Sequence, residues 1–162
     1  MSQLTLTLPD GNSINVDRGA SFSDAVGIIG AGLLRNSLAV TFNDKHYSLS
    51  DLVPADGTLS VITKSSEDGY DTLRHSAAHL LAWAVQDLYP GTKFAFGPSI
   101  ENGFYYDFDR EEPFTEEDLV SIENKMVELS KNKEVINRRE ITKSDAEELF
   151  ADQPYKLEQI SE

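Results

Sequence analysis

A short polar segment, residues 64–69 (KSSEDG), divides this chain of 162 residues into two parts with different sequence patterns. Before it, short runs of alternating apolar and polar residues predict strands, whereas longer helical periodicities dominate after it. The charge changes at the same point. Residues 1–64 carry four basic and six acidic side chains, and the rest of the chain carries ten and 22. We therefore predict two domains, residues 1–63 and 70–162, joined by a linker over residues 64–69.

The composition excludes several classes of protein. With a net charge of −14, the chain lacks the basic surface that a stand-alone nucleic-acid-binding protein needs for phosphate contacts. It contains no cysteine, which excludes disulfides and thiolate chemistry within it and agrees with a cytoplasmic location. The N-terminus lacks the pattern of a signal peptide, and no apolar run approaches the ~20 residues that span a bilayer. We expect a soluble cytoplasmic protein without a membrane partner.

The first part has the element order of a small mixed sheet. The predicted elements are a hairpin over residues 3–17, a helix that Ser21 or Ser23 caps and that Gly30 and Gly32 end, and strands at 38–42, 46–48 and 59–62. One helix among these strands packs across the sheet to bury its apolar face. This order predicts a β-grasp, the ubiquitin-like arrangement.

The second part is richer in helices. The pattern predicts helices at residues 71–88, 115–132 and 144–150, with Ser144 as the cap of the last one. It also predicts strands at 94–96, 103–108 and 135–141 and a new element that starts at Pro154. Thr115 and Asp118 form a capping box at the start of the second helix. The predicted class of the whole chain is α+β, with the helices of this second part packed on an antiparallel sheet.

His75 and His79 are four residues apart on the first helix of the second part, so both project from one face. Two imidazoles in this arrangement bind a metal, hold a substrate or shuttle protons, or they form an ordinary surface pair. Ser76 stands where the zinc-protease motif has a glutamate. Because two histidines leave tetrahedral zinc two ligands short, we expect no metal site and no cofactor in this chain.

Residues 97–107 (GPSIENGFYYD) concentrate turn-forming residues, two tyrosines and a carboxylate. In a strand Tyr105 and Tyr106 point to opposite faces. One tyrosine can therefore belong to the core while the other lines a pocket.

Residues 73–81 (LRHSAAHLL) and 97–107 together resemble the editing domain of threonyl-tRNA synthetases. Residues 6–11 (LTLPDG) and 56–62 (DGTLSVI) resemble the start and end of the TGS domain that precedes editing in these enzymes. Alanyl-tRNA synthetases place their related editing domain after the catalytic one. The resemblance covers nearly the whole chain and implies a TGS domain followed by the N-terminal part of an editing domain.

The resemblance implies a reaction, the hydrolysis of serine mischarged onto threonine tRNA. A synthetic site that selects threonine must also admit serine, since one missing methyl group is worth only ~1–3 kcal/mol, so a second site corrects the error. By position, His75 and His79 match the paired catalytic histidines of the family. Tyr106 matches a pocket tyrosine and Lys156 a lysine near the ester, and Asp107 is a further substrate-binding candidate.

The chain departs from the family where the site should be completed. A Cys-x-x-x-His segment follows in the family, whereas this chain has no cysteine and no histidine after His79. The synthetic domain, which uses ATP, Mg and one zinc, and the anticodon-binding domain are also missing. We expect an engineered truncation rather than a short paralog, inactive and monomeric alone and binding RNA weakly or not at all. The full-length protein would be a homodimeric threonine–tRNA ligase whose editing site receives the CCA end of tRNA(Thr).

Two other functions remain open. A stand-alone metal-dependent hydrolase would use His75 and His79, with Asp107 as a third ligand. A non-enzymatic regulatory module is the other alternative, because TGS units also occur in GTPases and stringent-response proteins.

Overall fold

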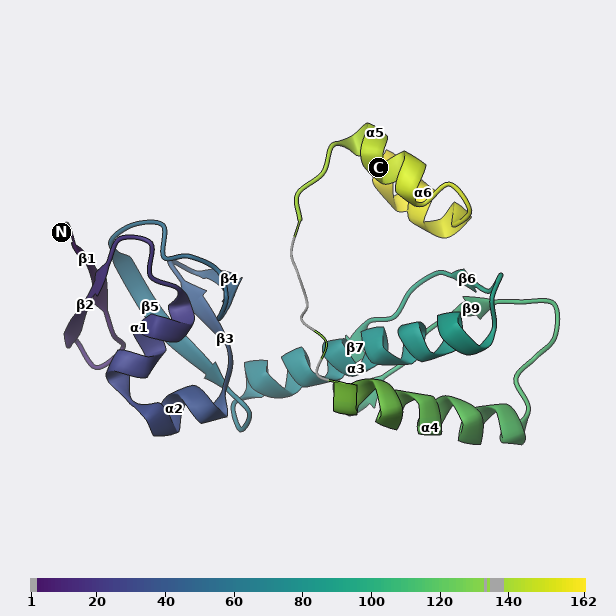
Figure 1. Ribbon diagram of the computed structural model, residues 1–162, viewed down its shortest axis with the longest axis horizontal. Helices are drawn as coiled ribbons and strands as arrows, with labels where there is room; N and C mark the ends of the chain where they lie inside the picture. The colour runs from purple at the N-terminus through teal and green to yellow at the C-terminus, as the bar shows by residue number, and fades with distance from the viewer. Residues whose placement is uncertain (1–2, 133, 135–138) are drawn as a thin grey trace. The chain divides into compact units, whose positions relative to one another are not determined.

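The computed structural model describes residues 3–132, 134 and 139–162 (Figure 1). The chain divides into two compact units, Met1–Leu73 and Arg74–Glu162. The boundary lies inside helix α3 (Glu67–Leu88), which begins within the segment predicted to be a linker. Ser66 is the reason, because its hydroxyl accepts the Gly69 N–H at 3.1 Å and so caps the first turn of the helix. The division into domains at residues 63 and 70 stays a prediction.

The first unit is a mixed five-stranded sheet with a helix across one face (Figure 1). Its strands are β1 (Gln3–Thr7), β2 (Ser13–Asp17), β3 (Ser37–Phe42), β4 (Lys45–Ser48) and β5 (Gly57–Thr63), in the spatial order β2-β1-β5-β3-β4. The central strands β1 and β5 are parallel, and the other neighbours are antiparallel. This is the predicted β-grasp order, and the α+β class is confirmed.

Helix α1 (Phe22–Ile29) begins where the sequence predicts it. Ser21 and Asp24 form a capping box, and Gly30 ends the helix. A second short helix, α2 (Ala31–Asn36), follows directly and was not predicted. Gly32, which the pattern assigns to the end of α1, lies within α2.

The core of the first unit lies between α1 and the sheet. Phe22 is fully buried, and its ring centroid lies 5.6 Å from that of Phe42 and 5.2 Å from that of Tyr47. Ala25 and Val26 bury the same face of the helix against strand residues such as Leu6. The alternation in β1 and the 3.6-residue period in α1 therefore meet in one apolar layer.

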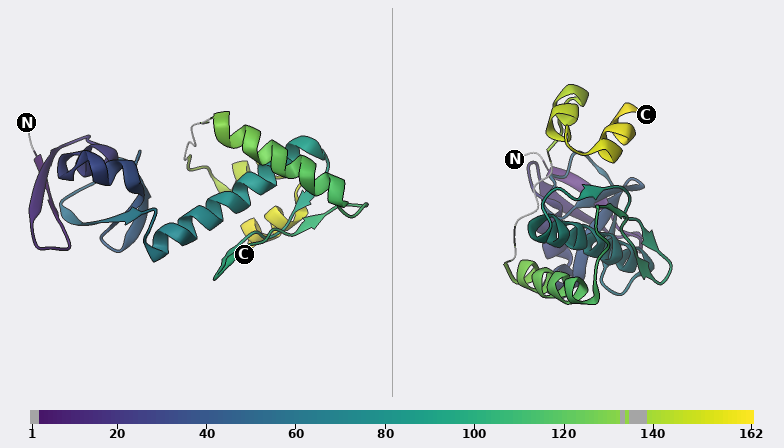
Figure 2. Two further views of the ribbon diagram at one scale, coloured as in Figure 1. Left: turned by 90° about the horizontal axis from the view of Figure 1, so that it is seen from below. Right: turned by 90° about the vertical axis from the view of Figure 1, so that its right-hand side faces the viewer.

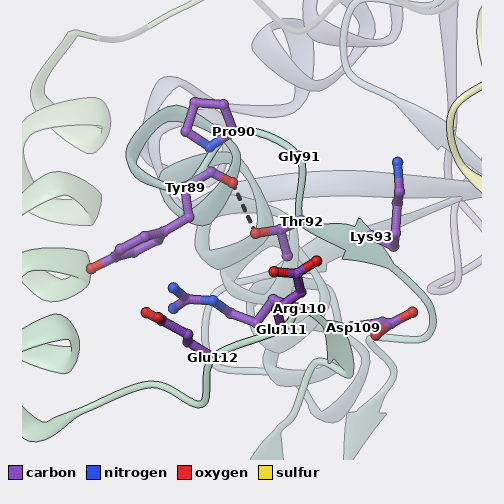
Figure 3. A pocket seen from close by; sticks show the side chains of 9 residues that line it. All are labelled: Tyr89, Pro90, Gly91, Thr92, Lys93, Asp109, Arg110, Glu111 and Glu112. Atoms are coloured by element: carbon purple, nitrogen blue, oxygen red, sulfur yellow. Dashed lines mark hydrogen bonds between the residues drawn. The ribbon is translucent and has the colours of Figure 1, made fainter.

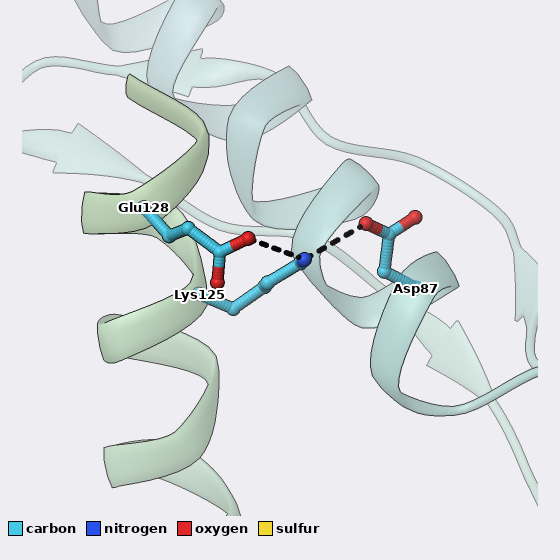
Figure 4. Close-up of polar contacts among 3 residues, drawn as sticks. All are labelled: Asp87, Lys125 and Glu128. Carbon is cyan, nitrogen blue, oxygen red and sulfur yellow. Dashed lines mark hydrogen bonds and ion pairs between the residues drawn. The ribbon is translucent and has the colours of Figure 1, made fainter. Parts of the chain in front are cut away.

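The second unit is built on α3 and α4 (Glu116–Asn132), which lie side by side (Figures 1 and 2). Ile122 and Leu129 of α4 and Val85 of α3 belong to the same buried cluster. At the rim of this contact, Lys125 Nζ lies 3.3 Å from Asp87 Oδ2 of α3 (Figure 4). The capping box predicted for α4 is present, since Thr115 Oγ1 accepts the Asp118 N–H at 3.2 Å.

Two short ladders replace the predicted antiparallel sheet. Strand β6 (Lys93–Phe94) pairs with β9 (Phe108–Asp109), and β7 (Ser99–Ile100) pairs with β8 (Gly103–Phe104). The prediction of one strand over residues 103–108 is therefore wrong at 105–107. The segment changes its partner there, from β7 to β6.

Helices α5 (Lys143–Leu149) and α6 (Pro154–Ser161) end the chain. Thr142, rather than the predicted Ser144, caps α5, because its hydroxyl accepts the Asp145 N–H. Of the strand predicted at 135–141, residues 135–138 lie outside the described residues, and residues 139–141 form no strand. Among the helices described, none combines the length and apolar character needed to cross a membrane.

Replacing Phe22 with alanine should lower the free energy of unfolding of the first unit by about 3–5 kcal/mol, because a fully buried ring is lost and a cavity remains. Urea titration followed by far-UV circular dichroism measures this change. Trp83, the only tryptophan, reports separately on the second unit by fluorescence. Ile28→Ala is the control, since Ile28 is 58% exposed on α1 and should change stability by less than about 0.5 kcal/mol. Equal effects of the two substitutions would contradict this account of the core.

Candidate functional site

The two histidines of α3 are joined by a direct hydrogen bond. His79 Nε2 lies 3.0 Å from His75 Nε2, and the ring centroids are 4.6 Å apart at an interplanar angle of 82°. Both residues are exposed. Such a contact requires one nitrogen to donate and the other to accept, so the pair is held by a single shared proton between the two rings.

The pKa of His79 is lowered from its ordinary value, which is about 6.5. Desolvation of its ring is the largest cause, followed by repulsion from His75 and then from the ammonium group of Lys156. All three disfavour the imidazolium form. A neutral imidazole near pH 7 has a free lone pair, so it can accept a proton from water or a hydroxyl group.

His79 opens onto a cavity of about 620 Å³. Residues from α3, β6, the 105–107 segment and the α5–α6 region line it: His79, Ala82, Trp83, Gln86, Phe94, Tyr106, Leu149, Phe150, Asp152, Gln153 and Lys156. The α3 residues of this set are spaced by three and four, so they form one stripe of the helix. A concave site with mixed apolar and polar lining and a titratable group of altered pKa has the properties of a ligand site.

Tyr106 enters this cavity as part of an aromatic cluster. Its ring stacks on Phe108, with centroids 4.9 Å apart and an angle of 19°, and meets the edge of Phe94 at 6.1 Å. Gly97 lies beneath the ring, and a Cβ atom there would overlap it. Glycine at position 97 is therefore required by the close approach of the tyrosine ring.

The structure brings together most, but not all, of the residues singled out from the sequence. His79, Tyr106 and Lys156 line the cavity, and His75 contacts it through His79. Asp107 is exposed and does not line it. Asp107 alternates with Tyr106 along the backbone, which places the two side chains on different faces. The roles assigned to these residues stay predictions.

Sequence reasoning missed several polar or aromatic members of the cavity wall, among them Trp83 and Gln153. Trp83 is 39% exposed and lies four residues after His79, so the helical spacing that paired the histidines could also have identified it. Gln153 precedes Pro154 at the start of α6. No local pattern predicts that its side chain reaches β6, far away in the sequence.

A second cavity, of about 590 Å³, lies beside residues 89–93 and 109–112 (Figure 3). Two of its basic side chains make contacts within the unit, although Arg110 Nη1 is buried without a hydrogen-bond partner. The Arg110 guanidinium lies 4.6 Å from the ring centroids of both Tyr89 and Phe114, and Lys93 Nζ donates to Asp152 O at 2.7 Å. None of the residues predicted from the sequence lines this cavity, so the histidine cavity is the stronger candidate.

Metal ligands do not gather at either cavity. Within residues 3–132, 134 and 139–162, no group of three or more His, Cys, Asp or Glu side chains could hold a metal ion.

Comparison with known proteins gives one consistent result. No protein-family model matches the chain. The threonine–tRNA ligase of Staphylococcus carnosus is 38% identical to it over 160 residues, which is 99% of this chain and 25% of the relative. The enzyme of the same name from Marinobacter nauticus is 42% identical over 159 residues, 97% of this chain and 25% of the relative. That from Paramagnetospirillum magneticum is 44% identical over 161 residues, with 98% and 25% covered.

The similarity extends along the whole chain but not along the whole of the relatives. The chain spans about a quarter of the length of these curated proteins, and the matching part is their N-terminal quarter. The resemblance to threonyl-tRNA synthetases is thus confirmed for that region, and its division into a TGS and an editing domain stays a prediction.

His79 should titrate below the ordinary imidazole value when its ring resonances are followed by NMR across pH. As the pH falls through about 6.5, His79 binds a proton in the unfolded chain but not yet in the folded chain. The folded state therefore loses stability relative to the unfolded state. Replacing His79 with glutamine should remove this part of the pH dependence while leaving the other histidines in place. A normal or raised pKa for His79 would contradict the desolvation of its ring and the repulsion from His75 and Lys156.

Proposed function

We propose that this chain, a relative of the N-terminal quarter of threonine–tRNA ligases over its whole length, supplies half of a hydrolytic site that removes serine from mischarged threonine tRNA. The observation that carries the proposal is the hydrogen-bonded histidine pair at an open cavity that Tyr106 and Lys156 also line. The residues that line the cavity match the chemistry of an ester that must be held and attacked by water.

The charge and protonation state of each side chain determine the role that we assign to it in the reaction. A water molecule adds to the ester carbonyl carbon, and the bond from that carbon to the ribose oxygen breaks. The neutral imidazole of His79 is suited to accept the proton of the attacking water, and His75 can share it through their 3.0 Å contact. The ammonium group of Lys156 is suited to stabilise the negative charge that develops on oxygen. The products are free serine and a tRNA that ends in a hydroxyl group.

Substrate recognition follows from the charge of the chain. Most of the net charge of −14 lies after residue 64, so this unit cannot hold tRNA through phosphate contacts. We propose that other domains of the longer protein bind the body of the tRNA and that this unit receives only its flexible 3′ end. The longer protein would charge threonine tRNA with ATP in the cytoplasm.

The proposal predicts activity only in a complete protein. In a chimera, residues 1–162 would replace the N-terminal quarter of the Staphylococcus carnosus relative, and release of serine from seryl-tRNA(Thr) would be measured. His79→Ala in the chimera should slow hydrolysis by about 10²- to 10⁴-fold, the range for loss of a general base. His46→Ala, an exposed histidine on β4, is the matched control and should have no effect. An unchanged rate in the His79 variant would refute the proposed role.

The chain of 162 residues alone should not hydrolyse seryl-tRNA(Thr) above background. The reason is that the resemblance places a second group of site residues beyond those present here. The measurement is serine release at increasing concentrations of the purified chain. A rate that rises in proportion to the chain would show that His75, His79, Tyr106 and Lys156 form a sufficient site.

A further inference from the structure

One glutamine joins the start of α6 to the backbone at β6. Gln153 Oε1 accepts the Phe94 N–H at 3.0 Å, and Gln153 Nε2 approaches Thr92 O at 3.4 Å. The Phe94 N–H and the Thr92 C=O therefore both face the carboxamide group of Gln153. The carboxamide of Gln153 has the donor and acceptor of a peptide group, so it occupies the place of a third strand.

This contact satisfies a backbone group that water cannot reach easily. Phe94 is only 8% exposed and belongs to the core cluster of the second unit. A buried N–H without a partner is unfavourable, which gives the side chain of Gln153 a defined position. Edge strands are commonly covered in this way by another element of the same chain.

The backbone of the same glutamine holds the lysine of the cavity. Gln153 O accepts the Lys156 N–H at 3.0 Å and the Leu157 N–H at 3.1 Å. Gln153 thus connects β6 to Lys156 through two short links, one through its side chain and one through its carbonyl group. Phe94, at the other end, also contacts the ring of Tyr106, so both cavity residues take their position from the same strand.

Two further contacts hold α6 from its exposed side. Lys93 Nζ donates to Asp152 O at 2.7 Å, and Tyr155 OH donates to Asp109 Oδ2 at 2.9 Å. Both lie at the exposed surface, where water competes for the same groups. The partly buried contacts of Gln153 are therefore the ones that determine where the first turn lies.

We propose that Gln153 is a positioning residue, which fixes Lys156 beside His79 by completing the edge of β6. The importance of this for catalysis rests on the proposed function. The position itself does not, and it can be measured without a substrate. Gln153 has no contact with the reacting atoms and acts only through Lys156.

The test uses the charge of Lys156 as a reporter, because this charge is one of the causes that lower the pKa of His79. The titration of His79 is followed by NMR on the full chain of 162 residues. Lys156→Met should raise the pKa of His79. Gln153→Met, which keeps the length of the side chain and removes both hydrogen bonds, should raise it in the same direction. Gln159→Ala, an exposed position later in α6, should leave it unchanged.

A double variant separates positioning from a simple loss of structure. If Gln153 acts through Lys156, Gln153→Met should have no further effect on His79 in the Lys156→Met background. An equal rise in both backgrounds, or no rise in either, would overturn the proposal. Gln153→Ala serves as the second variant, and Trp83 fluorescence identifies which variants are folded. Loss of the folded unit in both would also overturn the proposal, because Gln153 would then be needed for the fold itself.

The two proposals can fail independently. If the chimera does not release serine but Gln153→Met still raises the pKa of His79, the proposed hydrolysis is refuted and the positioning role of Gln153 is supported. If the chimera releases serine but the pKa of His79 is unchanged in the Gln153 variants, the positioning role is refuted and the proposed hydrolysis is supported.

Discussion

The second unit depends on helix α3, which packs into the core on one face and lines the cavity with another. Along α3, Ala78 and Val85 are fully buried, and the stripe that contains His79 and Trp83 lines the cavity. Because the other face of α3 is packed against α4, the core fixes the backbone positions from which the two histidine side chains extend. Apolar packing therefore provides the rigidity that a preorganised site requires.

The aromatic cluster holds the other side of the cavity in place. Phe94 belongs to β6, Tyr106 to the segment between the two ladders and Phe108 to β9. The rings of these three residues contact one another. Tyr106 consequently has little freedom, and Gly97 is small because the ring lies directly above it. The short ladder β6–β9 contributes few hydrogen bonds, but it holds together residues that have both core and cavity contacts.

Electrostatics adds a constraint of a different kind. The unit is strongly acidic overall, yet the pKa of His79 is lowered, first by desolvation of its ring and then by repulsion from His75 and Lys156. A neutral imidazole beside an ammonium group is useful for attack on an ester, because one group accepts a proton while the other stabilises negative charge.

Local order in the sequence was enough to predict the elements whose signals are local. The capping boxes at Ser21 and Thr115, the alternation of β1 and β2, and the pairing of His75 with His79 all follow from residues a few positions apart. Helix α2 and the early start of α3 were missed because glycine and polar residues, which usually interrupt helices, were tolerated there. The break of the strand at 105–107 depended on which ladder each half joined, and that choice belongs to the tertiary structure.

The cavity itself was also determined by the tertiary structure. Lys156 approaches His79 because Gln153 bonds to a strand 59 residues away in sequence, and no periodicity encodes a contact made only when distant backbone groups become buried together.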